Sequence, residues 1–587
     1  MNTQQQDDDH IIMFPFMAQG HIIPFLALAK LISQRKPNTR ITLVSTPLNI
    51  KYLQLTLDSE TKTIYKNISL AELPFSGTDH GLPPNSENTD SLPSHLIESL
   101  FYASETLKPS FDNLITQIIT NEKRVPACII SDIFLGWVND IAERVGAYHI
   151  SFTTGGGYGT AVYFSMWMYL PHRKNDDDRN DLIEEFHVPE FPDTCRLHIS
   201  QLPVYLREAD KETPFAKFFQ KQISLSLKSD GMLCNTVEEI EVLGLETLRK
   251  HMDCKPVWTI GPLLPPFLLG NGRDSTNKGV ASNLRAGKEF GISPESCIEW
   301  LNHKKPSSVL YISFGSQNTI RASKMMELAL GLEKSGKCFI WVLRPPSEFD
   351  IKSEFRSEWL PQGFVERIKE SQRGLLVKKW APQLEILCHK STGAFLSHCG
   401  WNSVLESLSQ GVPIIGWPLA AEQCYNSKMM EEEMGVCMEL ARVDGQVANE
   451  DVKKIIEQVM DSSKGDEMRK KAMVIGEKIR ASMTEDKGEG DCQKGSSIRS
   501  VDDFLATVKG IKVKEKEVGV GSSRLPNALK TAVAKVTRKR KPQKTILDAP
   551  SNDDSQPVSG IRSQQLLMPH ADHSIPWYGS TYMPTPM

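Results

Sequence analysis

Short apolar runs alternate with longer amphipathic stretches along the first half of the chain. Runs rich in β-branched and aromatic residues predict strands, and the stretches between them have helical spacing. The strand candidates are IIMFPFMA, RITLVST, ACIISD, AYHISFT and GMLCNT. This alternation predicts an α/β domain with a mostly parallel sheet and helices on both faces. Pro15 is unfavourable inside a central strand because it cannot donate to the ladder, but we still expect a strand there.

The pattern stops near residue 262 and later begins again. Between residues 262 and 295 the chain is rich in Pro, Gly, Asn and Ser, which is typical of a linker. The later strand candidates are SSVLYISFGS, KCFIWVLRP, GLLVKKW, GAFLSHCG and VPIIGWP. They predict a second doubly wound domain, in which ligands bind beyond the carboxyl ends of the strands.

The C-terminal part has a different composition. Residues 509–544 carry 12 Lys or Arg against two acidic residues, and the segment that follows is rich in Pro, Ser, Asn and Gln. Such a segment cannot bury enough apolar surface to fold, so we predict a disordered tail. A solvated charge run is the favoured interpretation of TRKRKPQK, over a nuclear address or a nucleic-acid contact. The spacing of Leu525, Leu529, Val533 and Val536 would also suit a basic amphipathic helix in weak contact with a membrane.

These patterns predict the organisation of the whole chain, which at 587 residues is too long for one ordinary core. We expect an N-terminal domain over residues 1–261, a linker over 262–295, a second domain over 296–490, a helix over 491–508 that returns to the N-terminal domain, and a tail over 509–587.

Composition and charge narrow the class of protein. Apolar residues make up 40% and charged residues 24% of the chain, as in soluble globular proteins, and no apolar run is long enough to span a bilayer. With a net charge of -4, the chain has no overall positive potential that would attract nucleic acid or an acidic membrane. The polar, acidic start MNTQQQDDDH is neither a secretory signal nor a transit peptide. The 11 cysteines are scattered, without CxxC pairs or His/Cys clusters, so we expect reduced thiols, no zinc site and a cytoplasmic location.

The segment AFLSHCGWNSVLESLSQG is the strongest functional signal. An apolar strand ends at His398, and a helix is predicted to open at Trp401 and to close at Gly411. The first turn of a helix has free backbone N–H groups and a dipole that favours negative charge, and Asn402 and Ser403 are good capping residues. The junction therefore predicts an anion site, most plausibly for a phosphate.

Polar and aromatic residues follow neighbouring strands. Trp380 could offer a flat face to a base, Gln383 and Glu406 could bind ribose hydroxyls, and Glu422 and Gln423 are suited to a sugar. Alone, Trp380 or Trp401 would be read as a core aromatic, but the whole set at successive strand ends indicates one site. The run YISFGS adds a further phosphate candidate at Ser316, where an ordinary strand-to-helix turn is the alternative.

Two residues of the first domain could carry the chemistry. His21 and Asp132 each lie at the carboxyl end of a predicted strand, His21 before a helix expected to start near Pro24. A surface or capping role for His21 and an N-cap role for Asp132 are the alternatives. Together they suit a general base and the carboxylate that orients it.

The segment from WAPQ at Trp380 to the end of WPLAAEQ at Gln423 resembles the 44-residue signature of the plant family 1 UDP-glycosyltransferases. The resemblance covers about residues 10–508 and implies a GT-B fold, with two Rossmann-like domains facing a cleft. The implied uridine contacts are Trp380, Ala381, Gln383 and Glu406; the implied diphosphate contacts are Ser316, His398, Asn402 and Ser403; and the implied sugar contacts are Thr154, Trp401, Glu422 and Gln423. The GHxxP and SDxF settings of His21 and Asp132 match the family's catalytic pair.

The resemblance implies an inverting transferase that moves a hexose from a UDP-sugar to a hydroxyl of a small lipophilic plant metabolite. Gln423 favours glucose over galactose by the same resemblance. No metal or other cofactor is expected, so the Asp run in HRKNDDDRNDLIEEF is interpreted as a solvated loop. The expected partners are UDP-glucose and a hydroxylated aglycone, with no nucleic acid, and the protein is expected to be a monomer. A nucleotide-sugar epimerase and a non-catalytic UDP-sugar sensor remain as alternatives.

Overall fold

The computed structural model describes residues 9–59, 65–174, 182–270, 290–350, 352–442, 445–485 and 494–517. The predicted helix over 525–536, most of the predicted tail and the greater part of the predicted linker lie outside the described residues. So does the central part of the acidic run after His172, for which a solvated loop was predicted.

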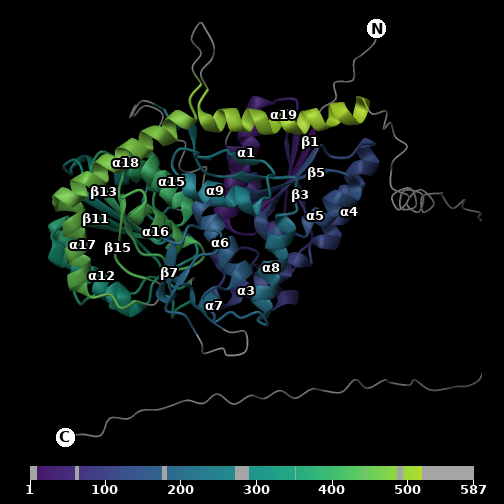
Figure 1. The fold of residues 1–587 in the computed structure, drawn as a ribbon. Helices are drawn as coiled ribbons and strands as arrows, with labels where there is room; N and C mark the ends of the chain where they lie inside the picture. Colours follow the sequence, from purple (N-terminus) through teal and green to yellow (C-terminus); the bar gives the residue numbers. More distant parts are fainter. Residues whose placement is uncertain are drawn as a thin grey trace, which may run out of the picture. The chain divides into compact units, whose positions relative to one another are not determined.

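A seven-stranded parallel sheet forms the centre of the first lobe (Figure 1). Its strand order is β3-β2-β1-β4-β5-β8-β9. The strands are β1 (His10–Phe14), β2 (Arg40–Ser45), β3 (Ile68–Glu72), β4 (Cys128–Asp132), β5 (Tyr148–Thr153), β8 (Gly231–Cys234) and β9 (Val257–Thr259). The order changes direction at β1, whose neighbours are β2 and β4, and ligands bind at such points in doubly wound sheets.

A six-stranded parallel sheet forms the centre of the second lobe, in the order β12-β11-β10-β13-β14-β15. Its strands are β10 (Val309–Ser313), β11 (Cys338–Leu343), β12 (Gly374–Lys378), β13 (Thr392–Ser397), β14 (Ile414–Gly416) and β15 (Cys437–Glu439). The point of reversal is β10, which pairs with β11 and β13. Both sheets therefore have the doubly wound arrangement that the alternating pattern predicts.

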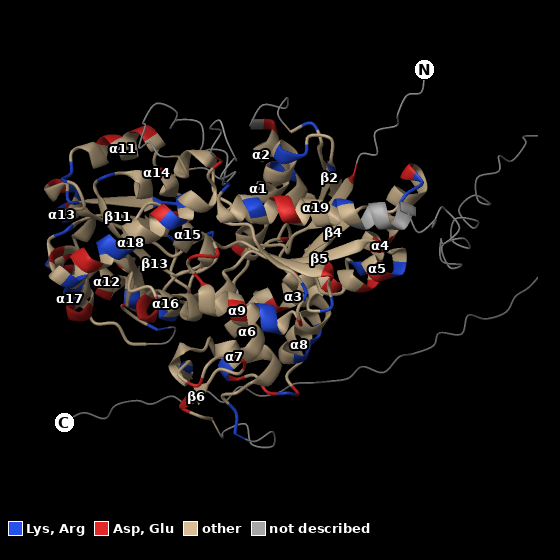
Figure 2. Cartoon of the chain, turned by 45° about the horizontal axis from the view of Figure 1, so that its top comes forward, with Lys and Arg blue, Asp and Glu red and all other residues tan. Residues whose placement is uncertain are grey.

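Helices cover both sheets. Those of the first lobe are α1 (Gln19–Arg35), α2 (Pro47–Ser59), α3 (Ile97–Glu105), α4 (Lys108–Glu122), α5 (Val138–Val145), α6 (Gly157–Tyr169), α7 (Val204–Arg207), α8 (Pro214–Ser226) and α9 (Val242–His251). Those of the second are α11 (Pro294–Asn302), α12 (Ala322–Ser335), α13 (Phe364–Ser371), α14 (Gln383–Cys388), α15 (Trp401–Ser409), α16 (Gln423–Glu432), α17 (Asn449–Asp461) and α18 (Ser463–Ser482). Acidic and basic residues mix on outer helices such as α12 and α17 (Figure 2). Lys334 of α12 pairs with Glu450 of α17 at 2.6 Å.

Several element boundaries differ from the sequence-based expectation. Strand β1 ends at Phe14, so Pro15 lies just after the strand and costs it no hydrogen bond. Helix α1 begins at Gln19 rather than near Pro24, which places His21 in its first turn. Strands β3, β9 and β15 and the antiparallel hairpin of β6 (Glu185–His187) and β7 (Arg196–His198) were not predicted. Most of these are only three residues long, too short to show an alternating pattern.

The last described helix, α19 (Ser496–Glu517), packs on the first lobe although it follows the second in sequence (Figure 1). Its side chains Val501, Phe504 and Val508 belong to the hydrophobic core of the seven-stranded sheet. The ring of Phe504 lies 5.4 Å from that of Trp258, edge to face. The tail was predicted to begin after Val508, but the helix continues into the basic segment as far as Glu517.

Three properties of the described residues bear on the class of protein. No helix among them is long and apolar enough to cross a membrane. The cysteines that the structure describes are free thiols. Within the same part of the chain, no group of three or more His, Cys, Asp or Glu side chains is arranged to hold a metal ion.

Candidate active site

A cavity of about 660 Å³ lies between the two lobes, at the carboxyl ends of strands from both sheets. It is lined by every site residue that the sequence predicted except Asp132: His21, Thr154, Ser316, Trp380, Ala381, Gln383, His398, Trp401, Asn402, Ser403, Glu406, Glu422 and Gln423. Strand ends far apart in the sequence meet here because parallel strands present their carboxyl ends at one edge of a sheet.

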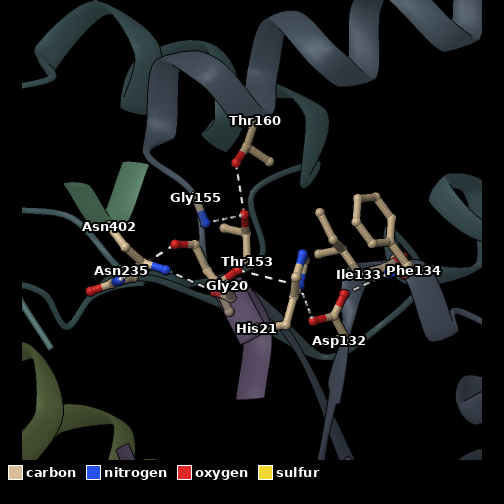
Figure 3. Close-up of polar contacts among 12 residues, drawn as sticks. Gly20, His21, Asp132, Ile133, Phe134, Thr153, Gly155, Thr160, Asn235 and Asn402 are labelled. Atoms are coloured by element: carbon tan, nitrogen blue, oxygen red, sulfur yellow. Dashed lines mark hydrogen bonds and ion pairs between the residues drawn. The ribbon is translucent and has the colours of Figure 1, made fainter. Parts of the chain in front are cut away.

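His21 and Asp132 form a direct pair at the first-lobe side of the cavity (Figure 3). The Nδ1 atom of His21 lies 2.6 Å from Oδ2 of Asp132, which is fully buried at the end of β4. His21 keeps 20% of its side-chain surface exposed and lines the cavity. Because Nδ1 is engaged by the carboxylate, Nε2 is the nitrogen that can accept a proton from a ligand.

The surroundings of His21 act on its pKa in opposite directions. Burial lowers the pKa, but the charge and hydrogen bond of Asp132 and the charge of Glu422 raise it, with a net pKa above 6.5. The hydroxyl Oγ1 of Thr154 lies 3.3 Å from the same Nδ1 atom. The pair therefore has the geometry and the electrostatics of a base with an orienting carboxylate.

Asp132 also has the capping role that was the alternative interpretation. Its Oδ1 atom accepts a hydrogen bond from the backbone N–H of Phe134 at 3.1 Å and caps a short 3-10 helix, Ile133–Leu135. One carboxylate thus serves both purposes, with one oxygen for the cap and the other for the imidazole. The cap holds the carboxylate in place, which fixes the ring that it contacts.

The predicted anion site is the N-terminus of α15. Gly400 is the N-cap residue, and no side chain caps this end of the helix. The expectation that Asn402 and Ser403 would cap the turn is wrong, because both lie inside the helix, at its second and third positions. Their backbone N–H groups come before that of Val404, the first to bond within the helix, to the oxygen of Gly400, so they are free to meet an anion in the cavity.

His398 lies beside this helix end, with the Cε1–Nε2 edge of its ring between two glycines. A Cβ atom at Gly400 would be 2.5 Å from His398 Nε2, and one at Gly315 would be 2.7 Å from the same atom. Burial, together with the charge of Arg344, lowers the pKa of His398 to about 4. The imidazole is therefore neutral at neutral pH and offers an N–H donor rather than a positive charge.

The residues predicted to hold the nucleoside are connected to one another. Gln383 donates from Nε2 to the carboxylate of Glu406 and to Oγ of Ser403, the latter at 3.2 Å. Its Oε1 accepts from the hydroxyl of Tyr311 at 3.0 Å. Trp380 and Ala381 precede α14 at the rim of the same cavity. Glu406 is thus oriented by an amide that is itself held at both ends.

Two of the residues predicted to contact the UDP-sugar use their side chains for hydrogen bonds to the first lobe. The indole of Trp401 is 2% exposed, and its Nε1 donates to the backbone oxygen of Asn235 at 2.7 Å. The indole N–H is therefore not available to a sugar. Asn402 donates from Nδ2 to the backbone oxygen of Gly20 at 3.0 Å, so its backbone N–H rather than that amide group faces the anion site.

Glu422 and Gln423 lie at the start of α16. The Oε1 atom of Gln423 accepts from the backbone N–H groups of Leu419 and Ala420, at 2.9 and 3.0 Å. This fixes the amide with Nε2 as the end that can reach a ligand. Burial raises the pKa of Glu422, and backbone N–H groups and the charge of His21 oppose the shift. The pair therefore offers one donor and one acceptor to a bound sugar.

Arg344 is a cavity residue that sequence reasoning missed. It follows β11, and its Nη1 donates to the backbone oxygens of Gly315 and Asn318, at 3.1 and 3.4 Å. Burial lowers the pKa of Arg344 to about 10, so the guanidinium stays charged at neutral pH. It shapes the Gly315–Ser316 turn and adds positive charge beside His398. Its place at a strand's carboxyl end, in the run WVLRP, was the available signal.

Comparisons with known proteins agree with this geometry. A family model described as "UDP-glucoronosyl and UDP-glucosyl transferase" matches residues 292–476, and one described as "Glycosyltransferase, N-terminal domain" matches residues 8–177. The chain is 42% identical to UDP-glycosyltransferase 92A1 of Arabidopsis thaliana, over 84% of this chain and 96% of that protein. It is 45% identical to crocetin glucosyltransferase 3 of Crocus sativus, over 78% of this chain and 92% of that protein.

Solved structures of the same kind match nearly the whole described fold. The crystal structure of Medicago truncatula UGT71G1 complexed with UDP-glucose has a TM-score of 0.66 at 25% identity, and the match covers 86% of this chain and all of that one. The crystal structure of Glycyrrhiza uralensis UGT73P12 has a TM-score of 0.69 at 27% identity, and the match covers 90% of this chain and all of that one.

Proposed function

The chain belongs to the plant family 1 UDP-glycosyltransferases, enzymes that transfer a sugar from a UDP-sugar, and on this premise we propose that it is an inverting glucosyltransferase acting on a hydroxyl of a small lipophilic metabolite. The observation that carries this proposal is the His21–Asp132 pair, 2.6 Å apart, which belongs to the first lobe, while the second lobe contributes the N-terminus of α15 to the same cavity. A base in one lobe and an anion site in the other suit a displacement between them.

In the proposed reaction, Nε2 of His21 takes the proton of the acceptor hydroxyl. The acceptor oxygen attacks the anomeric carbon from the face opposite the diphosphate, the bond to the departing UDP breaks, and the configuration inverts. Asp132 holds the ring through Nδ1 and stabilises the imidazolium that forms. The proton remains on His21 until the glycoside leaves.

Departure of the diphosphate is favoured by donors that are already in position. The backbone N–H groups of Asn402 and Ser403, the neutral imidazole of His398 and the Gly315–Ser316 turn line the same part of the cavity. Such preorganised donors stabilise developing negative charge without reorganisation at the moment of reaction. We propose that they act without a bound metal.

The acceptor half of the cavity has aromatic walls. The ring of Phe134 lies 5.3 Å from that of His21, and the rings of Phe16 and Phe101 are stacked at 4.4 Å. Phe215 and Phe219 continue the same wall. Because aromatic walls bind apolar, flat surfaces, we propose a lipophilic acceptor that places its hydroxyl beside His21.

Gln423 supports glucose as the transferred sugar. Its fixed Nε2 donor and the neighbouring Glu422 carboxylate can bind adjacent hydroxyls, and loss of such a match leaves polar groups unpaired at a cost of about 1–3 kcal/mol. Competition between UDP-glucose and UDP-galactose measures this directly. A higher kcat/KM for UDP-galactose would contradict the assignment.

One assay tests the whole proposal. The full-length protein is incubated with UDP-glucose and a mixed panel of hydroxylated aglycones, and separately with crocetin, the carboxylic acid for which one relative is named. We expect a β-glycoside, identified by the coupling constant of its anomeric proton. An α-glycoside would exclude inversion, an epimerised donor would indicate an epimerase, and binding of the donor without any product would indicate a sensor.

A further inference from the structure

Asn235 is a buried polar residue that the proposed mechanism does not use. It follows β8 in the first lobe, is 1% exposed and is not among the residues that line the cavity. Its backbone oxygen accepts from Nε1 of Trp401, in the second lobe, at 2.7 Å. Its side-chain Oδ1 accepts from the backbone N–H of Leu263 at 3.0 Å. Asn235 therefore contacts both the second lobe and the chain segment that leaves the first.

The bond to Leu263 sets the orientation of the Asn235 amide. With Oδ1 engaged, Nδ2 points toward Oδ1 of Asn402 at 3.5 Å (Figure 3). The same Nδ2 lies 3.4 Å from the backbone oxygen of Thr154. Asn402 in turn donates from Nδ2 to the backbone oxygen of Gly20 at 3.0 Å. In each amide the Nδ2 group therefore faces an acceptor: Nδ2 of Asn235 faces Oδ1 of Asn402, and Nδ2 of Asn402 faces the oxygen of Gly20.

The acceptor at Gly20 is available because of a proline. In an α-helix the oxygen of residue 20 would accept from the N–H of residue 24, and Pro24 has none. Asn402 supplies the missing donor from the other lobe. The two amides therefore connect the second residue of α15, in the anion site, to the residue immediately before His21.

We propose that Asn235 is a positioning residue that, through Asn402, holds the diphosphate end of α15 in register with the base His21. This rests on the proposed transferase function. The donor lies mainly on the second lobe and the base on the first, so the distance between anomeric carbon and acceptor oxygen depends on contacts between lobes. Misplacement of reacting groups by about 1 Å can cost about 10²-fold in rate.

The isosteric substitution Asn235→Asp tests this assignment. It keeps the acceptor for Leu263 and removes the donor, which places a carboxylate oxygen against the oxygens of Thr154 and Asn402. Asn402 can relieve this only by rotating its amide, and the rotation breaks its bond to Gly20. Asn235→Ser, which also shortens the side chain, is the second variant if Asn235→Asp does not fold. Asn139→Asp is the matched control, because Asn139 is a buried amide that contacts His149 away from the cavity.

The readouts are kcat for glycoside formation, the affinity for UDP, the melting temperature and hydrogen exchange of the peptides around residues 18–22 and 400–405. We expect Asn235→Asp to lower kcat by about 10- to 100-fold, to leave UDP affinity unchanged and to speed exchange in both peptides. Asn139→Asp should lower only the melting temperature. The proposal would be overturned if kcat and the hydrogen exchange of both peptides were unchanged. It would also be overturned if UDP affinity fell by the same factor as kcat. If the wild-type protein made no glycoside, the transferase function would fail, while the exchange arm would still test the contact.

Discussion

The imidazole of His21 is the only side chain of the described cavity that is paired with a buried carboxylate in the manner of a general base. We expect His21→Ala to lower kcat by about 10²–10⁴-fold, since an unactivated hydroxyl is a poor nucleophile at neutral pH. UDP affinity, measured by calorimetry, should hardly change because the predicted nucleotide contacts are on the other lobe. His303→Ala, at an exposed site, is the control. Near-normal turnover with weakened UDP binding would show that His21 is a structural residue.

The Asp132 carboxylate should determine the pH dependence of the same step. The pKa of His21 is raised above 6.5, and only the neutral ring is a base, so kcat/KM should fall as pH drops through a value above 6.5. Asp132→Asn removes the larger of the two charges that raise the pKa of His21 and leaves burial, which lowers the pKa, opposed only by the weaker effect of Glu422. The acidic limb should therefore move to lower pH while the maximal rate falls. An unmoved limb would mean that another group titrates.

At the scale of elements, the function of α15 depends on the space in front of its first turn. Gly400→Ala would place a Cβ atom 2.5 Å from His398 Nε2 and displace the imidazole from the anion site. Loss of one donor to a charged ligand costs about 1.5–3 kcal/mol, so UDP should bind about 10- to 100-fold more weakly. Gly510→Ala is the control, because nothing lies within 4 Å of a Cβ there. Unchanged affinity would exclude His398 as a donor to the diphosphate.

At the scale of the whole molecule, α19 joins the C-terminal end of the chain to the first lobe. A chain shortened to end at Val508 keeps the α19 side chains of the core, including Phe504, so its melting temperature and kcat should match those of the full chain. A chain shortened to end at Gly495 loses those side chains and should melt at a lower temperature. A loss of activity in the first shortened chain would show that residues beyond 508 act on the enzyme.

The sequence by itself determined the local features of this protein. The two doubly wound sheets follow from the alternation of apolar runs with amphipathic stretches, because that pattern is local and repeats over most of the chain. The predicted anion site at His398 rests on a strand that ends where a helix begins, and the 44-residue match from Trp380 to Gln423 assigns the family. Short strands such as β9 and β15 were not predicted, because three residues are too few to show an alternation of apolar and polar positions.

Only the tertiary structure decided which side chains meet. Asp132 could have been a cap or a partner of His21, and the fold makes it both by placing β4 beside β1. Asn402 was predicted as a cap and as a phosphate contact, and the fold directs its side-chain amide to Gly20 of the other lobe. Asn235 had no local signal for this role, since its partners in the second lobe, Trp401 and Asn402, are more than 150 residues away. Contacts between lobes depend on how the two sheets are placed relative to each other, and no periodicity within either one encodes that placement.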